Sequence, residues 1–315
     1  MNVFCKSLLT SALVTTTLSS AYAADPITVY GKLNITAQSN DEDGEQTTTI
    51  QSNASRLGVK GAFELKHNLE AFYTVEYEVA TGDDDKENFK ARNQIVGLKG
   101  SFGSVAIGRN DTMVKKAQGK MDYFNEYSGD LKNLFKGENR PEQTAEYVTP
   151  SFNHFRVGVT YAAEGSASQY GQNGYSLAAM YGDAKFKKSP VYISVAYDSA
   201  VKGYDVLQAT VQGKIANLRL AAMYQQQEET FDSDGNAIED SETKKGYLLS
   251  ASYAIDDVLL KGQYQELEDK GDSWSVGADY KLGKPTMLFA FYTSRSLEGF
   301  ESSDKYIGLG LEHKF

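Results

Sequence analysis

Apolar and polar residues alternate along almost the whole chain, and this alternation restricts the folds that the chain can adopt. Between residues 56 and 65, for example, Leu57, Val59 and Phe63 alternate with charged residues. Successive side chains of an extended strand point to opposite faces, so each such segment predicts a β-strand with one apolar face. The pattern recurs in residues 29–37, 56–65, 69–79, 155–161, 175–181, 191–197, 218–224, 247–253, 258–264, 274–280 and 307–315.

The connections between these segments alternate between short and long. Short ones are expected near residues 66–68, 101–104, 150–154, 182–189, 214–217, 254–257 and 281–284. Long ones are expected near residues 39–48, 80–90, 111–143, 162–173, 198–203, 226–244, 266–272 and 295–304. This order predicts roughly sixteen strands, the strand number of a barrel with a wide lumen, with both chain ends on the short-turn side. All 5 prolines fall in connections or at strand starts, where no ladder hydrogen bond is lost.

The first residues have the features of an export signal. Lys6 supplies a positive charge, residues 8–18 are mostly apolar and small, and residues 21–23 form a small-x-small cleavage site. The apolar run is shorter than the ~20 residues that a spanning helix needs. We therefore expect residues 1–23 to be removed as a signal peptide and residues 24–315 to form one domain. That domain contains no cysteine, because Cys5 leaves with the signal.

Composition favours a membrane barrel over a soluble sandwich. The chain has 21 Tyr, 15 Phe and 28 Gly, and its mean hydropathy of −0.46 fits strands in which only alternate residues are apolar. A soluble sandwich would fill its core with Tyr almost throughout and would have loops of similar length at both ends. Because hydrocarbon offers no hydrogen-bond partner, spanning strands must close on one another, and about sixteen strands leave an aqueous lumen. The predicted fold is all-β, a transmembrane antiparallel β-barrel of about sixteen strands.

Charge and histidine placement argue against two classes of function. From residue 24 onward, 31 Lys and Arg face 42 Asp and Glu, which gives a formal charge of −11 and disfavours nucleic-acid binding. His67, His154 and His313 all fall at the short-turn end, so none could serve as a base at the outer rim of a barrel hydrolase. We expect no enzymatic activity.

The acidic segment that begins at Asp232 partly matches the ligand pattern of a calcium-binding loop. Asp232, Asp234 and Asn236 could fill the first three ligand positions of a calcium loop. However, Ala237 stands where the turn needs glycine, and Thr243 stands where the closing glutamate belongs. We therefore expect a solvated acidic loop, with no metal site and no cofactor.

Several short segments resemble the Gram-negative general porins. The resemblance covers the chain from residue 24 onward and is densest up to about residue 155 and at the C-terminus. The segments are Tyr30-Gly31-Lys32, residues 55–61 (SRLGVKG), Arg92 followed by residues 97–99 (GLK), residues 108–110 (GRN), residues 122–130 (DYFNEYSGD) and residues 310–315 (GLEHKF).

The resemblance implies that the long third loop folds into the lumen and that its acidic residues face a basic wall. Carried over by position, the wall consists of Lys32, Arg56, Arg92 and Arg140, and the loop supplies Asp122 and Glu126.

The alternation supports part of this assignment by itself. It places Lys32 and Arg56 on the polar side of their strands, and a lipid-facing Arg near the membrane midplane would cost about 2–4 kcal/mol. Lys60 and Arg109 are possible additional lumen residues. Arg109 shares parity with Val105 and Ile107, so either the register shifts there or those residues also point inward.

The function implied is an outer-membrane porin that passes ions and small hydrophilic solutes down their gradients. Opposed charges beside low-dielectric walls orient water and disfavour apolar solutes, which gives a filter by size and charge. The net charge suggests a modest cation preference, which would weaken or reverse if the third-loop lysines face the lumen. Those residues are Lys115, Lys116, Lys120, Lys132 and Lys136.

A substrate-specific channel for sugar or phosphate is the alternative. Phe72, Tyr123, Phe124 and Tyr127 could form a stacking track for sugar, or could anchor the loop to the wall. The resemblance further implies a homotrimer in contact with lipopolysaccharide and outer-membrane lipids. It also implies that Phe315 is read by the barrel-assembly machinery, although an ordinary last strand could end in the same interfacial aromatic.

Overall fold

The computed structural model describes residues 27–81 and 88–315, and most of these residues lie in antiparallel strands. The predicted signal peptide lies outside the described residues and stays a prediction. The strands are β1 (Thr28–Glu42), β2 (Glu45–Ser52), β3 (Arg56–Leu65), β4 (Leu69–Val79), β5 (Phe89–Gly100), β6 (Gly103–Arg109), β7 (Thr144–Val148), β8 (Phe155–Ala162), β9 (Gly174–Gly182), β10 (Val191–Val201), β11 (Tyr204–Ile215), β12 (Leu218–Glu229), β13 (Lys244–Ile255), β14 (Val258–Leu267), β15 (Gly271–Lys281), β16 (Thr286–Leu297) and β17 (Asp304–Lys314).

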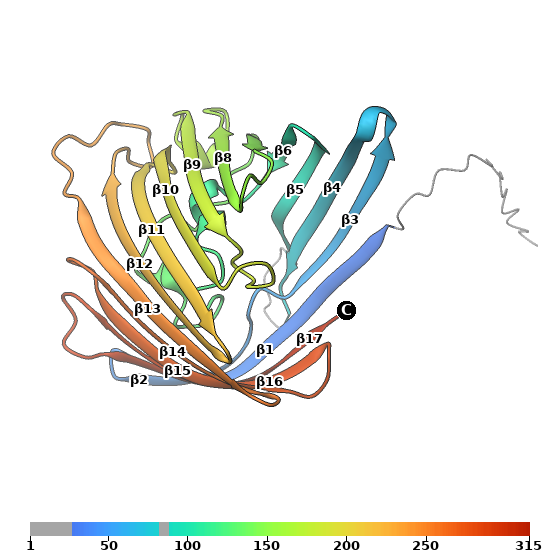
Figure 1. Ribbon diagram of the computed structural model, residues 1–315. Helices are drawn as coiled ribbons and strands as arrows, with labels where there is room; N and C mark the ends of the chain where they lie inside the picture. The colour runs from blue at the N-terminus through green and yellow to red at the C-terminus, as the bar shows by residue number, and fades with distance from the viewer. Residues whose placement is uncertain (1–26, 82–87) are drawn as a thin grey trace, which may run out of the picture.

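These strands form one closed sheet (Figure 1). The ring closes where β1 pairs with β17, from Lys32 opposite Lys314 to Asp41 opposite Lys305. β1 pairs on its other edge with β3 along its first half and with β2 along its second half. The 17 strand segments therefore fill 16 positions in the ring, because β2 and β3 share one position. The predicted antiparallel barrel of about sixteen strands is confirmed.

Three connections that the sequence predicted to be long are tight hairpins. β1 turns into β2 at Asp43 and Gly44, with φ of 52° and 81°, and β10 turns into β11 at Lys202 and Gly203, with φ of 53° and 77°. Two successive residues with positive φ are typical of type I′ turns, whose twist matches that of paired strands. β14 ends at Leu267 and β15 begins at Gly271, so the connection around Asp269 is also short. The predictions of long loops at residues 39–48, 198–203 and 266–272 were wrong, because these strand ends are rich in polar residues and glycine, as loops are.

The two faces of the barrel differ in polarity. On β17, Ile307 and Leu309 point outward and are 60% and 63% exposed, whereas Tyr306 points inward and is 3% exposed. Apolar area left in water is unfavourable by about 25 cal/mol per Å², so an outer band of this kind is suited to hydrocarbon. The inward face is rich in buried polar side chains, among them Asn34, Thr36, Gln38, Gln208, Gln212, Gln225, Gln263 and Gln265.

The connection between β6 and β7, residues 110–143, lies inside the ring; we call it the third loop (Figure 1). It contains the five-residue helix α1 (Met113–Ala117) and the 3-10 turn η2 (Leu131–Asn133). Two further 3-10 turns are η1 (Lys66–Asn68) and η3 (Ala167–Gln169). Across the described ranges, no helix is both long and apolar enough to cross a membrane.

Candidate functional site

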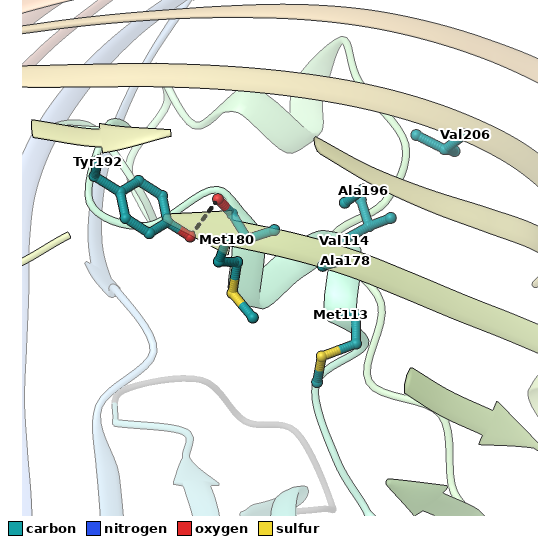
Figure 2. Packing of buried hydrophobic residues seen from close by; sticks show 8 residues of the cluster. Met113, Val114, Ala178, Met180, Tyr192, Ala196 and Val206 are labelled. Atoms are coloured by element: carbon teal, nitrogen blue, oxygen red, sulfur yellow. Dashed lines mark hydrogen bonds between the residues drawn. The ribbon is translucent and has the colours of Figure 1, made fainter. Parts of the chain in front are cut away.

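One side of the barrel interior binds the third loop through apolar contacts. Met113, Val114 and Ala117 of α1 are buried against inward-facing residues of β9, β10 and β11 (Figure 2). The Tyr192 hydroxyl donates a hydrogen bond of 3.0 Å to the carbonyl oxygen of Ala117. Inward apolar residues would be poorly placed in an aqueous lumen, and here they lie where the loop covers them. They are Ala178, Met180, Tyr192, Ala196 and Val206.

Two more clusters continue this attachment along the loop. Phe124 is fully buried beside Phe289 and Phe291 of β16, and the Tyr127 ring centroid lies 4.9 Å from that of Phe289. The other cluster joins Met121, Leu131, Leu134 and Phe135 of the loop to Met223, Leu248 and Leu267 of the barrel. We call β9–β14 and β16 together the anchoring wall.

Glutamine side chains of the anchoring wall bind the loop backbone. Gln212 donates to the carbonyl oxygen of Gln118 at 2.6 Å, Gln225 to that of Lys136 at 2.9 Å, and Gln263 to that of Gly129 at 3.1 Å. Buried backbone groups outside a ladder need partners of this kind. The anchoring wall therefore supplies both apolar packing and hydrogen bonds to the loop.

The tip of the third loop meets the opposite side, formed by β1, β3, β4 and β5, which we call the charged wall. The Glu126 carboxylate lies 2.7 Å from Nζ of Lys32 and 3.5 Å from Nη2 of Arg92, and it also pairs with Arg56. Glu126 has a φ of 73°, and its N–H donates to the Asp130 carboxylate at 2.6 Å. Burial by itself would raise the pKa of Glu126, but the three cations outweigh it and lower that pKa.

The charged wall contains acidic partners that the sequence reasoning did not single out. Nε of Arg92 lies 2.7 Å from Glu76, and Nη1 lies 2.9 Å from Glu78. Nζ of Lys32 also lies 3.2 Å from Glu312 of β17, the strand that pairs with β1 beside the charged wall. The alternation of β4 already places Glu76 and Glu78 on its polar face, so this signal was present in the sequence.

Arg140 lies in the returning arm of the third loop, beside the charged wall. Its Nε lies 2.8 Å from Oδ1 of Asp111 and donates to Oδ1 of Asn93 on β5 at 2.7 Å. Lys115 lies between Asp111, at 3.6 Å, and Glu138, at 2.8 Å. Burial would raise the pKa of Asp111, but Lys115 and Arg140 lower it on balance.

Asp122 and Lys60 have other partners. Asp122 borders the lumen, but its carboxylate accepts the N–H groups of Phe124 at 2.9 Å and Leu131 at 3.0 Å, which folds the loop tip. Burial and the nearby Asp130 carboxylate raise the pKa of Asp122. Nζ of Lys60 lies 4.9 Å from the centroid of the Tyr30 ring.

Neither alternative for Arg109 describes the structure, because β6 pairs with β5 without a register shift, from Gly103 opposite Gly100 to Arg109 opposite Gln94. Val105 and Ile107 point outward and are 39% and 60% exposed. Gly108, the residue before Arg109, has a φ of 132°. Nη2 of Arg109 lies 3.1 Å from Glu142, at the loop end of the barrel.

The last residue extends the closing strand pair. Gly31 donates to the carbonyl oxygen of Phe315 at 3.0 Å, and the Phe315 N–H donates to that of Gly31 at 3.2 Å. The Phe315 side chain is 55% exposed. This placement is compatible with both an assembly signal and an interfacial aromatic residue.

A cavity of about 940 Å³ remains between the third loop and the charged wall. The predicted residues Lys32, Arg56, Arg92, Arg140, Asp122 and Glu126 all line it, whereas Lys60 and Arg109 do not. In total, 10 Lys and Arg and 8 Asp and Glu line the cavity, although the whole chain is acidic. Four of the five third-loop lysines contribute, namely Lys115, Lys116, Lys120 and Lys132.

Three of the four aromatic residues considered for a sugar track, Tyr123, Phe124 and Tyr127, belong to the cluster that packs the loop on β16. Phe124 is fully buried, and Phe72 does not line the cavity. Tyr127 lines it but packs on β16, and its hydroxyl accepts a hydrogen bond of 3.1 Å from the Asn34 amide. Within residues 27–81 and 88–315, no group of three or more His, Cys, Asp or Glu side chains is arranged to hold a metal ion.

Known proteins share both the sequence pattern and the fold. The family model for Gram-negative porins matches residues 10–299. The major outer membrane protein P.IB of Neisseria meningitidis serogroup B is 26% identical over 98% of this chain and 99% of its own length. A monosaccharide porin of Halomonas is 25% identical over 80% of this chain and 74% of its own length.

A solved structure supports the architecture independently. The anion-selective porin of Comamonas acidovorans superposes with a TM-score of 0.73 at 19% identity, covering 92% of this chain and 99% of that one. The closed ring of strands, the charged cavity and the family match agree with one another. The chain therefore belongs to the Gram-negative porin family and is a β-barrel channel of the bacterial outer membrane.

Proposed function

We propose that this channel is a general diffusion pore whose constriction lies between the third loop and the charged wall. The observation that carries the proposal is the water-accessible cavity of about 940 Å³ inside a closed ring, lined by 18 charged residues. Lys32, Arg56, Arg92 and Arg140 act as the basic side of the filter, and Glu126 acts as its acidic side. The chain needs no cofactor for this role and catalyses no reaction.

Within this function, we propose a preference for anions. The cations that line the cavity outnumber the carboxylates, and the most central acid, Glu126, is shared by three of them. A charge excess between low-dielectric walls changes local ion concentrations far more than the same charge on an open surface. Local charge at the constriction therefore outweighs the net charge of the chain, which by itself suggests a cation preference.

The remaining partners follow from family membership and are also proposals. The barrel assembles as a homotrimer with one pore per subunit, in contact with lipopolysaccharide and other outer-membrane lipids. Phe315 serves as the signal read by the barrel-assembly machinery, and residues 1–23 direct export. Asp122 acts within the constriction by folding the loop tip.

Planar-bilayer recording of the purified protein tests the proposed function. We expect stable conductance in KCl, steps in groups of three, and a reversal potential under a KCl gradient that favours chloride. Liposome swelling should be fast with pentoses and slow with trisaccharides, without saturation. Saturable, solute-competed conductance would instead favour a sugar-specific channel, and an impermeable protein would contradict the channel itself.

A further inference from the structure

Two lysines of the cavity differ from the other cations that line it. Of the 10 lining Lys and Arg residues, 8 form ion pairs with carboxylates of the described chain. The exceptions are Lys120 of the third loop and Lys185 of the β9–β10 turn, residues 183–190. Both side chains are exposed to the cavity. The fold therefore presents two ammonium groups to the lumen without an acidic partner among the described residues.

Close packing holds the two lysines near each other. A Cβ added at Gly119 would lie 2.9 Å from Cβ of Ala184, so the residues that precede the two lysines are in contact. Gly119 has a φ of 70°, which allows this approach. The Gln212 amide oxygen accepts the Lys120 N–H at 3.3 Å, and fixes the loop backbone there.

The nearby carboxylates are already engaged. Asp183 accepts three backbone N–H groups of its own turn, from Lys185 at 2.9 Å, Lys187 at 3.0 Å and Lys188 at 3.2 Å. Glu126 is shared by the cations of the charged wall. These acids fold the turn and hold the loop tip, so the charges of Lys120 and Lys185 remain available to a mobile ion.

We propose that Lys120 and Lys185 form a binding seat for multivalent oxyanions, such as inorganic phosphate, pyrophosphate and small phosphorylated solutes. The inference rests on the proposed diffusion function, because the ligand must reach the seat through the lumen. Two ammonium groups offer up to six donors to an oxyanion but no acceptor, so neutral sugars gain little from them. A multivalent anion contacts both charges at once, whereas chloride neutralises only one.

The electrostatic setting is consistent with this seat. Burial lowers the pKa of Lys120, and the neighbouring positive charges of Lys185 and Arg56 lower it further. Like charges held near each other repel, and a bound oxyanion relieves that repulsion. The position between the third loop and a short turn places the seat on the path of permeating anions.

Block of KCl current by inorganic pyrophosphate tests the seat. We expect pyrophosphate to reduce the single-channel current in a concentration-dependent way. Lys120→Gln and Lys185→Gln should each raise the half-blocking concentration roughly tenfold, since each removes one charge-assisted contact. The double variant should be blocked least. Inorganic phosphate should follow the same order at higher concentrations.

Lys187→Gln is the matched control, because it removes the same charge from the same turn at a residue that does not line the cavity. It should keep the wild-type half-blocking concentration within about a factor of two, as expected for a screened surface charge. Equal weakening by Lys187→Gln, or unchanged block in the double variant, would overturn the seat. The wild-type protein and every variant are also recorded in KCl alone. If the wild-type protein showed no conductance in KCl, that result would count against the channel function rather than the seat.

Discussion

The two sides of the barrel interior build different surfaces from the same alternating strands. The anchoring wall presents Met, Phe and Gln side chains inward, and the third loop covers them. The charged wall presents Lys, Arg and Glu inward, and the third loop meets it through polar and charged contacts, chiefly those of Glu126 and Arg140. Inward-pointing apolar residues therefore lie where the third loop packs, and inward-pointing charged residues lie where the lumen stays filled with water.

This difference separates two properties of the channel. Contacts on the anchoring wall fix the position of the loop and hence the width of the pore. Contacts on the charged wall set the field that a permeating ion meets. Substitutions on the first wall should therefore change loop order and conductance, and substitutions on the second should mainly change selectivity.

The largest effect should come from removing the Phe124 ring, which attaches the third loop to β16. Phe124→Ala removes a fully buried ring from the cluster that contains Phe289 and Phe291, which typically costs about 3–5 kcal/mol. The loop should detach locally while the barrel remains closed. Limited trypsin digestion should then cut the third loop, and single-channel current should become larger and noisier.

Phe300→Ala is the matched control for that experiment. Phe300 is 60% exposed in the connection between β16 and β17, so its removal opens no buried cavity. It should leave both digestion and current unchanged. A Phe124→Ala protein with wild-type trypsin resistance would show that the apolar contacts do not hold the loop.

The next effect concerns the charged wall. Glu126→Gln keeps the shape of the side chain but removes the carboxylate shared by Lys32, Arg56 and Arg92. The freed positive charge should raise the chloride-to-potassium permeability ratio roughly fivefold, or about 1 kcal/mol for a partly screened interaction. Reversal potentials under a KCl gradient measure this ratio.

A second substitution of the same kind separates position from charge count. Glu301→Gln removes one negative charge from the exposed β16–β17 connection. It should leave the reversal potential close to that of the wild-type protein. An equal shift in both variants would contradict the idea that local charge at the constriction sets selectivity.

The contact at Glu126 should also respond to acid. The pKa of this carboxyl is lowered in the folded protein, so its stabilising contribution is complete above the unfolded pKa of about 4.3. The contribution is lost as the pH falls through the lower folded pKa. Selectivity should therefore be constant from pH 7 to 5, and chloride preference should rise below about pH 4. The rise should be smaller in Glu126→Gln, and an equal rise in both proteins would assign it to other carboxyls.

The fold was more predictable than the site for a physical reason. Alternation is local, so it correctly predicted the ring of strands. It could not distinguish a strand that is polar on both faces from a loop, and the tight turn at Asp43 was missed. Pairings such as Arg140 with Asn93 depend on how distant segments pack. Asp122 shows the same limit, because the neighbouring sequence does not indicate that its carboxylate accepts backbone N–H groups of the loop.

The smallest effect is expected for Lys136→Gln. This variant tests whether a third-loop lysine changes ion selectivity through its charge alone or only when it lines the cavity. Nζ of Lys136 lies 4.4 Å from the centroid of the Tyr204 ring and does not line the cavity. Lys136→Gln should lower stability by about 0.5–1 kcal/mol, through loss of an exposed cation–π contact, and should leave the reversal potential unchanged. Thermal unfolding and reversal potential are measured on the same preparation. If chloride preference fell instead, the total charge of the loop would set selectivity, and the two walls would not have separate roles.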